Sequence, residues 1–524
     1  MISLKIDNKT VKVEEGSPVI LAAKHAGIEI PSMCWREGKP HLTSCMICLV
    51  KDGPGGKLFP SCSVEAKEGM EIITLDDEIR EARKTGLELL LSEHVGDCEA
   101  PCQLTCPAHM DIPRMNRLLA RGEFEEALKI IKKDIALPAV FGRVCPAPCE
   151  GACRRKQVDE PVSICLLKRA AGDHKLGQEG YLIPEKEKDT GKKVGVIGAG
   201  PAGLAAAYFL QLKGYSCTVY DRDKKPGGSL WKEVEAGALP TEVLEMEVDI
   251  IRGLGAEFKM EYLVDRDKFR EISKGSDAIL IAAGMNGTGV ENWGLDMTDR
   301  GVDADMSTYR VGETGIFVAG SALRPAKLAI RTLGQGKEVS FSIDQYLQGK
   351  QVEGEKFMFN SRFSRLMDIE IAEYLKESVE GKRIEPAEPS EGLDREQVMR
   401  EAARCLHCDC RDIDTCRLRI YSDAYHADQK RFKSEERKPI KKYLQRNVVV
   451  YEPAKCIRCG ICVEITAEHA EKYGLTFIGR GFDIEVGIPF EKDIEQGLEK
   501  VALEAADACP TGALARAGNE LRGG

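Results

Sequence analysis

The feature that most constrains this chain is a dense block of thiols with one imidazole, HVGDCEAPCQLTC at residues 94–106. One histidine and three cysteines follow one another at four-residue steps, and three further cysteines repeat that step later in the chain. Soft thiolate ligands at this density favour iron–sulfur clusters or zinc, and the other cysteine groups decide between the two. The residues of this block and its repeat are His94, Cys98, Cys102, Cys106, Cys145, Cys149 and Cys153.

The chain is acidic, with 524 residues and a net charge of −10, which argues against nucleic acid or an anionic membrane as a partner. It contains no run of about 18 apolar residues that could cross a bilayer. Its first residues alternate like a strand and lack the order of a signal peptide. We therefore expect a cytoplasmic protein, in which the twenty cysteines stay reduced rather than paired as disulfides.

Residues 1 to about 75 predict a small β-rich domain, with strands at 2–6 and 10–14 and a helix from Pro18 to Ala26. Four cysteines then follow with the spacing C-x10-C-x2-C-x13-C. Loop thiolates around glycine-rich turns suit a [2Fe–2S] cluster, because the sulfides need nearby backbone N–H donors. A zinc ribbon is the alternative, although it favours two C-x2-C pairs and only one is present. The candidate ligands are Cys34, Cys45, Cys48 and Cys62.

The stretch EGMEIITLDDEIREARKTGLELLLSEHVGDC follows this domain and predicts a helix that Asp76 or Asp77 can cap. Together with the first domain, it resembles the N-terminal ferredoxin region of the large iron–sulfur subunit of respiratory complex I and of [FeFe]-hydrogenases. In that family the matching histidine and the next cysteine both ligate a [4Fe–4S] cluster. The resemblance therefore implies that His94 and Cys98 are ligands. A surface or packed histidine is the alternative.

From Cys98 onward the chain resembles a different family. CEAPCQLTCPAHMDIP, GEFEEALKII and FGRVCPAPCEGACRR are similar to the helical domain of the glutamate synthase small subunit, which dihydropyrimidine dehydrogenase shares. That domain holds two [4Fe–4S] clusters with interleaved ligands. The resemblance implies one cluster at Cys98, Cys102 and Cys153, with His94 in place of a cysteine that is absent here. It implies a second cluster at Cys106, Cys145 and Cys149.

The fourth ligand of this second cluster is not given by the resemblance. The acidic or amide ligand of that family aligns near Lys168, which cannot ligate. Cys165 lies one helical turn earlier and is the candidate replacement, because positions i and i+3 share a helix face. An ordinary buried cysteine is the alternative.

Residues 191–350 predict a separate α/β domain that binds a nucleotide. KKVGVIGAGPAGLAAAYFLQLKGYSCTVYD gives a strand, a tight glycine turn, a helix and a second strand, with Asp221 at the end of that strand to bind a ribose hydroxyl. The later strands DAILIAAG and GIFVAGS resemble those of FAD-binding proteins of the glutathione reductase class, although Ser321 stands where that class usually has an aspartate. The candidate cofactor-binding residues are Gly198, Gly200, Pro201, Ala202, Gly203, Asp221, Gly227, Gly228, Gly284, Gly320 and Ser321.

A nicotinamide-binding module is missing from this domain. In the glutamate synthase family a second dinucleotide fold is inserted between the two late FAD strands. Here only 30 residues separate Gly284 from Gly315, whereas a domain needs at least about 50. We therefore expect FAD in this chain, with any NAD(P)H chemistry on a partner.

Two further cysteine groups lie towards the end of the chain. REAARCLHCDCRDIDTC predicts one [4Fe–4S] cluster, with a zinc site as the alternative. CIRCGIC and the later ACPTGAL resemble the other [4Fe–4S] segment of the complex I subunit, because a proline follows the distant cysteine. The candidate ligands are Cys405, Cys408, Cys410 and Cys416 in the first group and Cys456, Cys459, Cys462 and Cys509 in the second.

The expected fold is multidomain, combining α/β and α+β parts. Its cofactors are one [2Fe–2S] cluster, four [4Fe–4S] clusters and FAD, with only Cys217 left over among the cysteines. The expected segments are a β-grasp-like [2Fe–2S] ferredoxin domain at 1–78, a helical double-cluster domain at 79–190, a Rossmann-type FAD domain at 191–350, a linker with a four-cysteine motif at 351–445, and a C-terminal [4Fe–4S] domain at 446–524.

No acid–base or nucleophilic constellation stands out, so we name no catalytic side chain and expect electron transfer. The modules predict a subunit of a cytoplasmic, anaerobic, multisubunit oxidoreductase linked to NAD(P)H and ferredoxin. Its partners would be redox subunits of a formate dehydrogenase, an [FeFe]-hydrogenase or an electron-bifurcating complex. One alternative is a stand-alone NAD(P)H-dependent reductase of the glutamate synthase small-subunit type. Another is a cluster-bearing scaffold without flavin.

Overall fold

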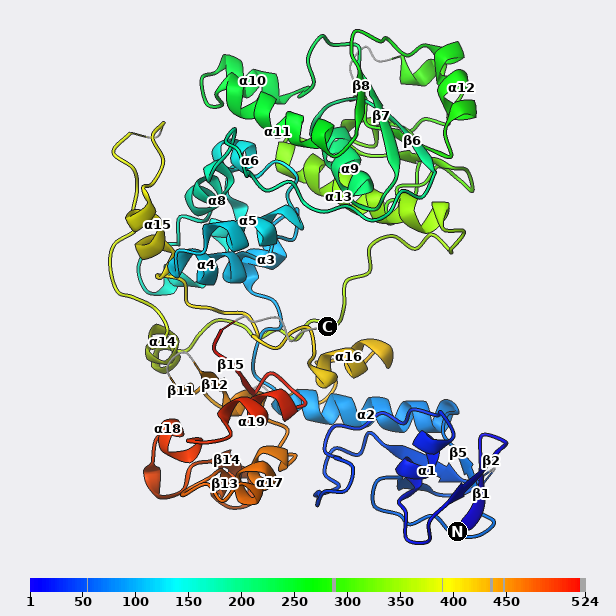
Figure 1. Cartoon of the computed structure of the whole chain (residues 1–524), viewed down its shortest axis with the longest axis vertical. Helices are drawn as coiled ribbons and strands as arrows, with labels where there is room; N and C mark the ends of the chain where they lie inside the picture. Colours follow the sequence, from blue (N-terminus) through cyan, green and yellow to red (C-terminus); the bar gives the residue numbers. More distant parts are fainter. Residues whose placement is uncertain (54, 285–288, 389, 434–436, 446–447, 519–524) are drawn as a thin grey trace. The chain divides into compact units, whose positions relative to one another are not determined.

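The computed structural model describes the chain except for residues 54, 285–288, 389, 434–436, 446–447 and 519–524. It contains two compact units, each built from segments that are separated in the sequence (Figure 1). The first unit comprises Met1–Glu99, Met358–Lys376 and Cys408–Gly524. The second unit comprises Ala100–Phe357 and Glu377–His407.

The first unit begins with a five-stranded sheet in the order β2–β1–β5–β3–β4. β1 pairs with β2 in antiparallel fashion, with Leu4 opposite Val11, and with β5 in parallel. Alternate apolar residues of these strands share a core with Val19 and Ile20 of α1, which confirms the predicted strands and helix. The bounds are β1 Ile2–Ile6, β2 Lys9–Val13, α1 Val19–His25, β3 Leu49–Asp52, β4 Leu58–Pro60 and β5 Glu71–Ile73.

The long helix α2 (Asp77–Glu93) connects this sheet to the first of the predicted ligands. Asp76 caps it by accepting a backbone N–H of the first turn at 2.8 Å, which confirms the predicted cap. Arg83, buried on this helix, donates to the carbonyl oxygen of Leu49 at 2.7 Å and so ties the helix to β3. His94 follows the last turn directly, so a rigid element sets its position.

The rest of the first unit surrounds a second core, to which Leu87 and Leu91 of α2 contribute. β12 lies between β11 and β15, β13 pairs with β14, and α17 packs against α19. The bounds are α14 Asp368–Leu375, α16 Arg417–Ala424, β11 Tyr443–Gln445, β12 Val449–Tyr451, α17 Ile461–Glu468, β13 Thr476–Ile478, β14 Glu485–Gly487, α18 Ile494–Gly497, α19 Ala502–Ala508 and β15 Leu514–Arg516.

The second unit starts with a group of short helices, as the sequence predicts. α6 and α8 cross closely: a Cβ atom added at Gly142 would lie 2.4 Å from Cα of Arg169, and one at Gly172 would lie 2.6 Å from the backbone nitrogen of Ala139. This contact brings the end of α6 to the start of α8. The bounds are α3 Pro101–Thr105, α4 Ile112–Ala120, α5 Phe124–Lys132, α6 Pro138–Val144, α7 Pro148–Gly151 and α8 Ile164–Asp173.

The predicted dinucleotide fold follows as a parallel sheet in the order β10–β9–β6–β7–β8. The apolar helix α9 packs against α13, and none of the described helices is long and apolar enough to cross a bilayer. The bounds are β6 Lys193–Ile197, α9 Pro201–Leu212, β7 Ser216–Tyr220, α10 Leu230–Glu235, α11 Thr241–Gly253, β8 Glu257–Lys259, α12 Arg266–Gly275, β9 Ala278–Ile281, β10 Ile316–Val318 and α13 Ala329–Leu347.

Residues 351–445, which the sequence predicts to be a linker, contain helices and belong to both units. α14 and α16 lie in the first unit, whereas α15 (Arg395–Ala402) packs against α4 and α8 of the second. Asp394 and Gln397 form a reciprocal capping box at the start of α15. The charged composition of this segment therefore reflects surface helices and buried ion pairs.

A buried ion pair joins the helical group to the sheet domain of the second unit. Nζ of Lys132 lies 4.0 Å from Oε2 of Glu247, and the other carboxyl oxygen accepts the N–H of Ala139 at 2.9 Å. Burial raises the pKa of Glu247 to about 7 and lowers the pKa of Lys132. Between its ordinary pKa of 4.5 and about 7, Glu247 keeps its proton only in the folded chain, so stability falls as the pH rises through this window.

We predict that Glu247→Gln removes this pH dependence, because the amide keeps an acceptor for Ala139 and cannot ionise. Wild type and variant should melt at similar temperatures at pH 5. At pH 8 the variant should be more stable, by at most about 3 kcal/mol, since one pKa unit corresponds to about 1.4 kcal/mol. The exposed Glu245→Gln serves as the control. A difference in melting temperature that is the same at both pH values would contradict the prediction.

Candidate metal centres and nucleotide site

The predicted metal ligands lie in largely buried groups in both units. Within the described part of the chain, no three His, Cys, Asp or Glu side chains are arranged as ligands of a single metal ion. The groups are defined instead by contacts between thiols and by backbone N–H groups that point at the sulfur atoms. Such donors stabilise thiolates and are typical of iron–sulfur sites.

The four N-terminal cysteines form the first group. Sγ of Cys34 lies 3.4 Å from Sγ of Cys45, and Cys62 is within hydrogen-bonding reach of both Cys34 and Cys48. The hydrogen bond with Cys62 lowers the pKa of Cys48 to about 7. All four side chains are buried, so the predicted [2Fe–2S] ligands converge from their loops on one place.

The C-terminal group converges in the same way. Cys456, Cys459, Cys462 and Cys509 line one small cavity, with Tyr451 beside them. The N–H of the residue two positions after Cys456 donates to its Sγ at 3.3 Å. Burial raises the pKa of Cys456 to about 11, because it disfavours the charged thiolate.

A local backbone turn recurs at three of the predicted ligands. The second residue after each of these cysteines has a left-handed backbone conformation, although none is glycine. This turn points consecutive N–H groups towards one side and creates an anion-binding concavity. The cysteine and left-handed residue are Cys145 with Ala147 (φ 55°), Cys405 with His407 (φ 49°), and Cys456 with Arg458 (φ 54°).

His94 is half-buried, and its buried Nδ1 has no hydrogen-bond partner in the protein. Its Nδ1 makes no hydrogen bond, and the imidazole donates instead to the carbonyl of Lys455, which also accepts from Oγ1 of Thr511 at 3.1 Å. Burial lowers the pKa of His94 to about 3, so the ring is neutral. A neutral imidazole with one nitrogen fixed on a carbonyl and the other free is the arrangement of a metal-ligating histidine.

Cys98 lies beside cysteines from much later in the chain. The N–H of Cys410 donates to the carbonyl of Cys98 at 3.0 Å, and the N–H of Ser361 donates to Sγ of Cys98 at 3.4 Å. Burial raises the pKa of Cys410, and the neighbouring thiols of Cys416 and Cys98 raise it further. Cys98, Cys410 and Cys416 are therefore neighbours in the first unit.

The sequence groups Cys98 with Cys102 and Cys153, and it groups Cys405 with the cysteines up to Cys416. Within the first unit, Cys98 instead has Cys410 and Cys416 as neighbours, which the sequence did not predict. Both predicted groupings combine cysteines of the two units and stay predictions.

The helical part of the second unit contains a further group of thiols. Cys145, at the end of α6, and Cys149, on α7, are both within hydrogen-bonding reach of Cys165 at the start of α8. Sγ of Cys165 also lies 3.9 Å from the carbonyl oxygen of Cys145. Cys106 and Lys168 are near the same thiols. The close crossing of α6 and α8 thus brings Cys165 to the position that the sequence left open.

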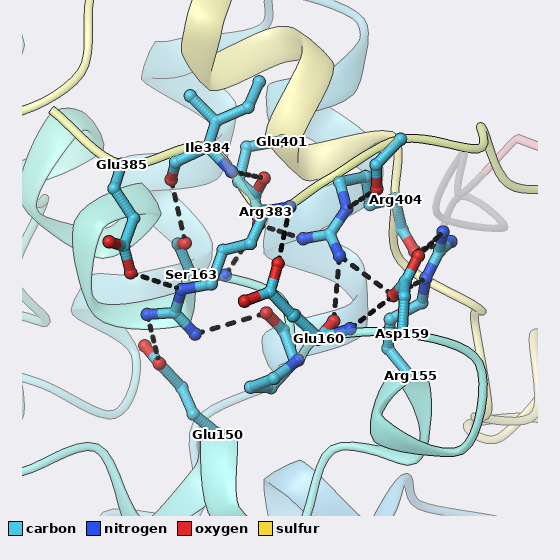
Figure 2. A network of polar contacts seen from close by, with 12 residues as sticks. Glu150, Arg155, Asp159, Glu160, Ser163, Arg383, Ile384, Glu385, Glu401 and Arg404 are labelled. Atoms are coloured by element: carbon cyan, nitrogen blue, oxygen red, sulfur yellow. Dashed lines mark hydrogen bonds and ion pairs between the residues drawn. The ribbon is translucent and has the colours of Figure 1, made fainter.

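A network of charged contacts surrounds Glu401 and Arg404, which lie just before Cys405 in the sequence (Figure 2). Arg155 donates to the carbonyl of Arg404 at 2.9 Å, and the guanidinium of Arg404 binds Glu401 at 2.7 Å and Asp159 at 3.0 Å. Glu401 in turn accepts the N–H groups of two further backbone positions at 2.8 Å each. Because these groups are largely buried, loss of one partner would leave an uncompensated charge.

The same network places Cys405 near Cys153. Burial raises the pKa of Cys153, and the positive charge of Arg404 acts in the opposite direction. Arg155 lies two residues after Cys153, and Arg404 directly precedes Cys405. Since α3, which carries Cys102, packs against α7 just before Cys153, three thiols of the second unit lie on adjoining segments.

A cavity of about 890 Å³ opens at the carboxyl ends of the parallel strands, the usual place for a ligand in this kind of sheet. Its wall also includes Val144 and Pro146, the two neighbours of Cys145. Nine of the eleven residues predicted to bind the cofactor line it; Gly203 and Gly227 do not. The nine are Gly198, Gly200, Pro201, Ala202, Asp221, Gly228, Gly284, Gly320 and Ser321.

Gly200 and Gly203, two glycines at the start of α9, have different surroundings. A Cβ atom at Gly200 would meet no protein atom within 4 Å, whereas one at Gly203 would lie 1.9 Å from the carbonyl oxygen of Gly198. Gly200 therefore leaves open space in the cavity wall, and Gly203 allows α9 to approach the turn. Asp221 accepts the N–H of Ala199 at 2.6 Å, so the predicted ribose ligand also supports the glycine turn.

The sequence missed several residues of the cavity wall. Trp293 lines the cavity with its buried indole nitrogen unpartnered, and it stacks on Phe269. Leu328 and Ala329, at the start of α13, also line the cavity. A tryptophan in an irregular segment carries no pattern that would have identified it, whereas the helix α13 could have been recognised by its length and apolar face.

Four segments of the chain match known domain families. A 2Fe-2S iron-sulfur cluster binding domain matches residues 1–77, and a 4Fe-4S domain described as domain II of dihydropyrimidine dehydrogenase matches residues 92–179. A Rossmann-like domain described as NAD(P)-binding matches residues 196–265. The ferredoxin-like domain of NADH-quinone oxidoreductase subunit 3 matches residues 446–515.

Among curated proteins, the chain is 37% identical over 205 residues to the beta subunit of NADPH-Fe(3+) oxidoreductase of Geobacter sulfurreducens, covering 38% of this chain and 30% of that one. It is 37% identical over 209 residues to the beta subunit of NADP(+)-dependent formate dehydrogenase of Moorella thermoacetica (36% and 30%). It is 35% identical over 200 residues to the glutamate synthase [NADPH] small chain of Bacillus subtilis (36% and 40%).

The chain thus spans less than half the length of each of these relatives. A solved NAD+-reducing [NiFe]-hydrogenase is 28% identical over 18% of this chain and 39% of its own, with a TM-score of 0.17. The chain is therefore homologous in part to redox subunits, and it combines a 2Fe-2S domain, 4Fe-4S domains and a Rossmann-like nucleotide domain.

We predict that Gly200→Val yields folded protein without the nucleotide that copurifies with the wild type. A Cβ atom at position 200 meets no protein atom within 4 Å, and Gly200 lines the cavity, so the fold and the iron content should be unchanged. Gly203→Val is the contrasting variant: its clash with a backbone carbonyl should destabilise the second unit itself. Nucleotide release on denaturation, iron analysis and circular dichroism measure these outcomes. Full nucleotide content in folded Gly200→Val would place the ligand elsewhere.

Proposed function

We propose that this chain is an electron-transfer subunit of a cytoplasmic, multisubunit oxidoreductase linked to NAD(P)H and ferredoxin, with FAD in the second unit and iron–sulfur clusters in both units. The observation that carries the proposal is the shared wall between the nucleotide cavity and a thiol group: Val144 and Pro146 line the cavity, and Cys145 lies between them. A nucleotide cofactor and a cluster would therefore be adjacent.

The cavity suits FAD in its chemistry and extent. Its volume is near the upper end of the range for ligand pockets, about 300–1,000 Å³. It extends from Asp221, placed for an adenosine ribose, to the start of α13 and the helices that carry the thiols. The unpartnered indole N–H of Trp293 offers a donor to an adenine or ribose. When bound, a flavin exchanges electrons singly or in pairs, and iron–sulfur clusters exchange them singly.

Helix α13 links the cavity to the thiol group on the protein side. Its first residues line the cavity, and at Gly334 an added Cβ atom would lie 2.3 Å from the carbonyl oxygen of Pro107, which follows Cys106. Any side chain at position 334 would therefore push the helix away from this loop. We propose that α13 fixes the separation between flavin and cluster, on which the electron-transfer rate depends.

Contacts between thiols, and in one case the adjoining segments that carry them, support five clusters with ligand sets that differ in part from those the sequence suggests. The first unit would hold one [2Fe–2S] cluster and two [4Fe–4S] clusters, and the second unit two [4Fe–4S] clusters. One set of the second unit has three named residues, because Cys408 belongs to the first unit. The sets are Cys34, Cys45, Cys48 and Cys62; His94, Cys98, Cys410 and Cys416; Cys102, Cys153 and Cys405; Cys106, Cys145, Cys149 and Cys165; and Cys456, Cys459, Cys462 and Cys509.

The three sets of the first unit share one apolar core, which supports electron exchange among them. Cys34, Cys416 and Cys459 all belong to that core, and the thiols of Cys34 and Cys459 are close enough to interact. The side chain of Leu42, in the [2Fe–2S] loop, lies against Gly460. The apolar surroundings exclude water between the sets and keep their separations fixed.

A second candidate function is a stand-alone NAD(P)H-dependent reductase. The description of the matching Rossmann-like family as NAD(P)-binding favours it, as do the names of the relatives. Against it stands the single dinucleotide fold of the described chain, which FAD would occupy. The two functions differ in whether the isolated chain reacts with a nicotinamide.

We predict that Cys98→Ala and Cys410→Ala each remove the same cluster, because both residues belong to one set. Wild type should contain about 18 irons, and the double variant Cys98→Ala/Cys410→Ala should lose about four, as each single variant does. The matched double variant Cys98→Ala/Cys102→Ala should lose about eight, because its residues belong to different sets. Iron analysis with electron paramagnetic resonance distinguishes the cases. Equal losses in the two double variants would restore the grouping of Cys98 with Cys102.

We predict that the isolated chain shows no flavin reduction by NADH or NADPH, yet is reduced by dithionite or reduced ferredoxin. The physical reason is that the described chain offers one dinucleotide fold and FAD would fill it. Stopped-flow absorbance of anaerobic protein measures the reaction. Gly200→Val, which should lack flavin, is the control for absorbance changes at the clusters. Rapid flavin bleaching by either nicotinamide would replace the proposal by the stand-alone reductase.

A further inference from the structure

We propose that Cys165 and Lys168 act as one charge-compensating pair at the cluster of Cys106, Cys145 and Cys149: Cys165 supplies the fourth thiolate, and the ammonium group of Lys168 sets the reduction potential of that cluster. The proposal rests on the proposed function, because it presupposes that this cluster is present.

Helix α8 places the two residues on one face. Cys165 and Lys168 occupy positions i and i+3 of the helix, so their side chains lie one above the other along it. The N–H of Cys165 donates to Oε1 of Glu150 at 3.0 Å, which anchors the first turn. Cys165 is within hydrogen-bonding reach of both Cys145 and Cys149, so its thiol joins theirs at one place.

Lys168 differs from the other buried lysines because, among the described residues, no carboxylate forms an ion pair with it. Each of the other described lysines that is less than 9% exposed has a carboxylate within 4.0 Å, whereas the ion pairs of the described residues include none for Lys168. The other lysines and their partners are Lys51 with Asp76, Lys132 with Glu247, Lys337 with Asp134, and Lys442 and Lys455 with Glu452.

The charged groups that face Lys168 are the four thiols themselves. Lys168 is buried and lies close enough to the thiols of Cys165, Cys145, Cys106 and Cys149 for its charge to interact with all four. A buried ammonium group without a counter-charge would cost several kcal/mol, so it is retained only beside a comparable negative charge. The cluster and its four thiolates would supply that charge.

The effect on the cluster follows from electrostatics. Reduction adds a negative charge to the cluster, and a fixed positive charge nearby stabilises the reduced form more than the oxidised form. Lys168 should therefore raise the potential of this cluster above the value it would have beside a neutral side chain. Because Pro146 and Val144 separate Cys145 from the nucleotide cavity, the cluster so tuned is the one next to the flavin site.

The test is a redox titration of the full-length protein, followed by electron paramagnetic resonance, in which the cluster is identified by its loss in Cys145→Ala. Lys168→Met should shift the potential of this cluster downward and leave the other four unchanged. Lys168→Arg keeps the charge and should keep the potential close to that of the wild type. Lys132→Met, a fully buried lysine of the same unit that faces Glu247, is the matched control and should not shift it.

A separate pair of variants tests the role of Cys165. Cys165→Ala should lose this cluster or convert it to a three-iron form, whereas Cys217→Ala, a buried cysteine outside all the sets, should change nothing. An unchanged potential in both Lys168→Met and the alternative Lys168→Gln would overturn the assignment of Lys168, and an intact four-iron cluster in Cys165→Ala would overturn that of Cys165. If Cys145→Ala removes no cluster, the proposed function itself fails.

Discussion

Thiols that ligate one cluster have to converge in the protein interior, and in this chain they come from segments far apart in the sequence. The backbone hydrogen bond between the N–H of Cys410 and the carbonyl of Cys98 closes a chain excursion of 311 residues between its two ends. Leu87 and Leu91 of α2 share an apolar core with the C-terminal helices of the same unit. A cluster at this point would join the two ends of the excursion more strongly than one hydrogen bond can, because metal–thiolate binding contributes directly to the free energy of folding.

Charge compensation imposes a second requirement on the same interior. Buried thiolates and the clusters they hold are anionic, and their stability depends on nearby N–H donors and cations. The left-handed turns after Cys145, Cys405 and Cys456 supply N–H donors without a net charge, whereas Lys168 supplies a full positive charge at one group only. Lys455 sits between a carboxylate and Cys410, so its charge is shared. The chain thus gives chemically similar groups different electrostatic surroundings, which is the means by which a protein sets different potentials.

Local sequence patterns predicted much of this structure because the interactions behind them are local. The strands of β1 and β2, the cap at Asp76 and the glycine turn at Gly198 depend on neighbours in the chain, and the i, i+3 relation brought Cys165 to its group. The grouping of residues 405–416 depends instead on parts of the chain that are distant in the sequence. Four cysteines in twelve residues are enough to close a cluster, and nothing in their spacing reveals that the chain passes from one unit to the other between His407 and Cys408. Trp293 was missed because an isolated aromatic residue in a loop has no periodicity.

The points where the chain passes between the units have a consequence for electron transfer. The first passage lies between Cys98 and Cys102, and the last lies between Cys405 and Cys408. In the proposed ligand sets, Cys98 and Cys102 serve different clusters, and covalent geometry limits the distance between them, since four residues span at most about 14 Å. Cys102 and Cys106 likewise serve two different clusters of the second unit and are again four residues apart. The four-residue steps of the block at residues 94–106 would therefore do more than supply ligands. Because the last two steps, from Cys98 to Cys102 and from Cys102 to Cys106, each pass from one cluster to the next, the backbone itself limits the separation of successive clusters.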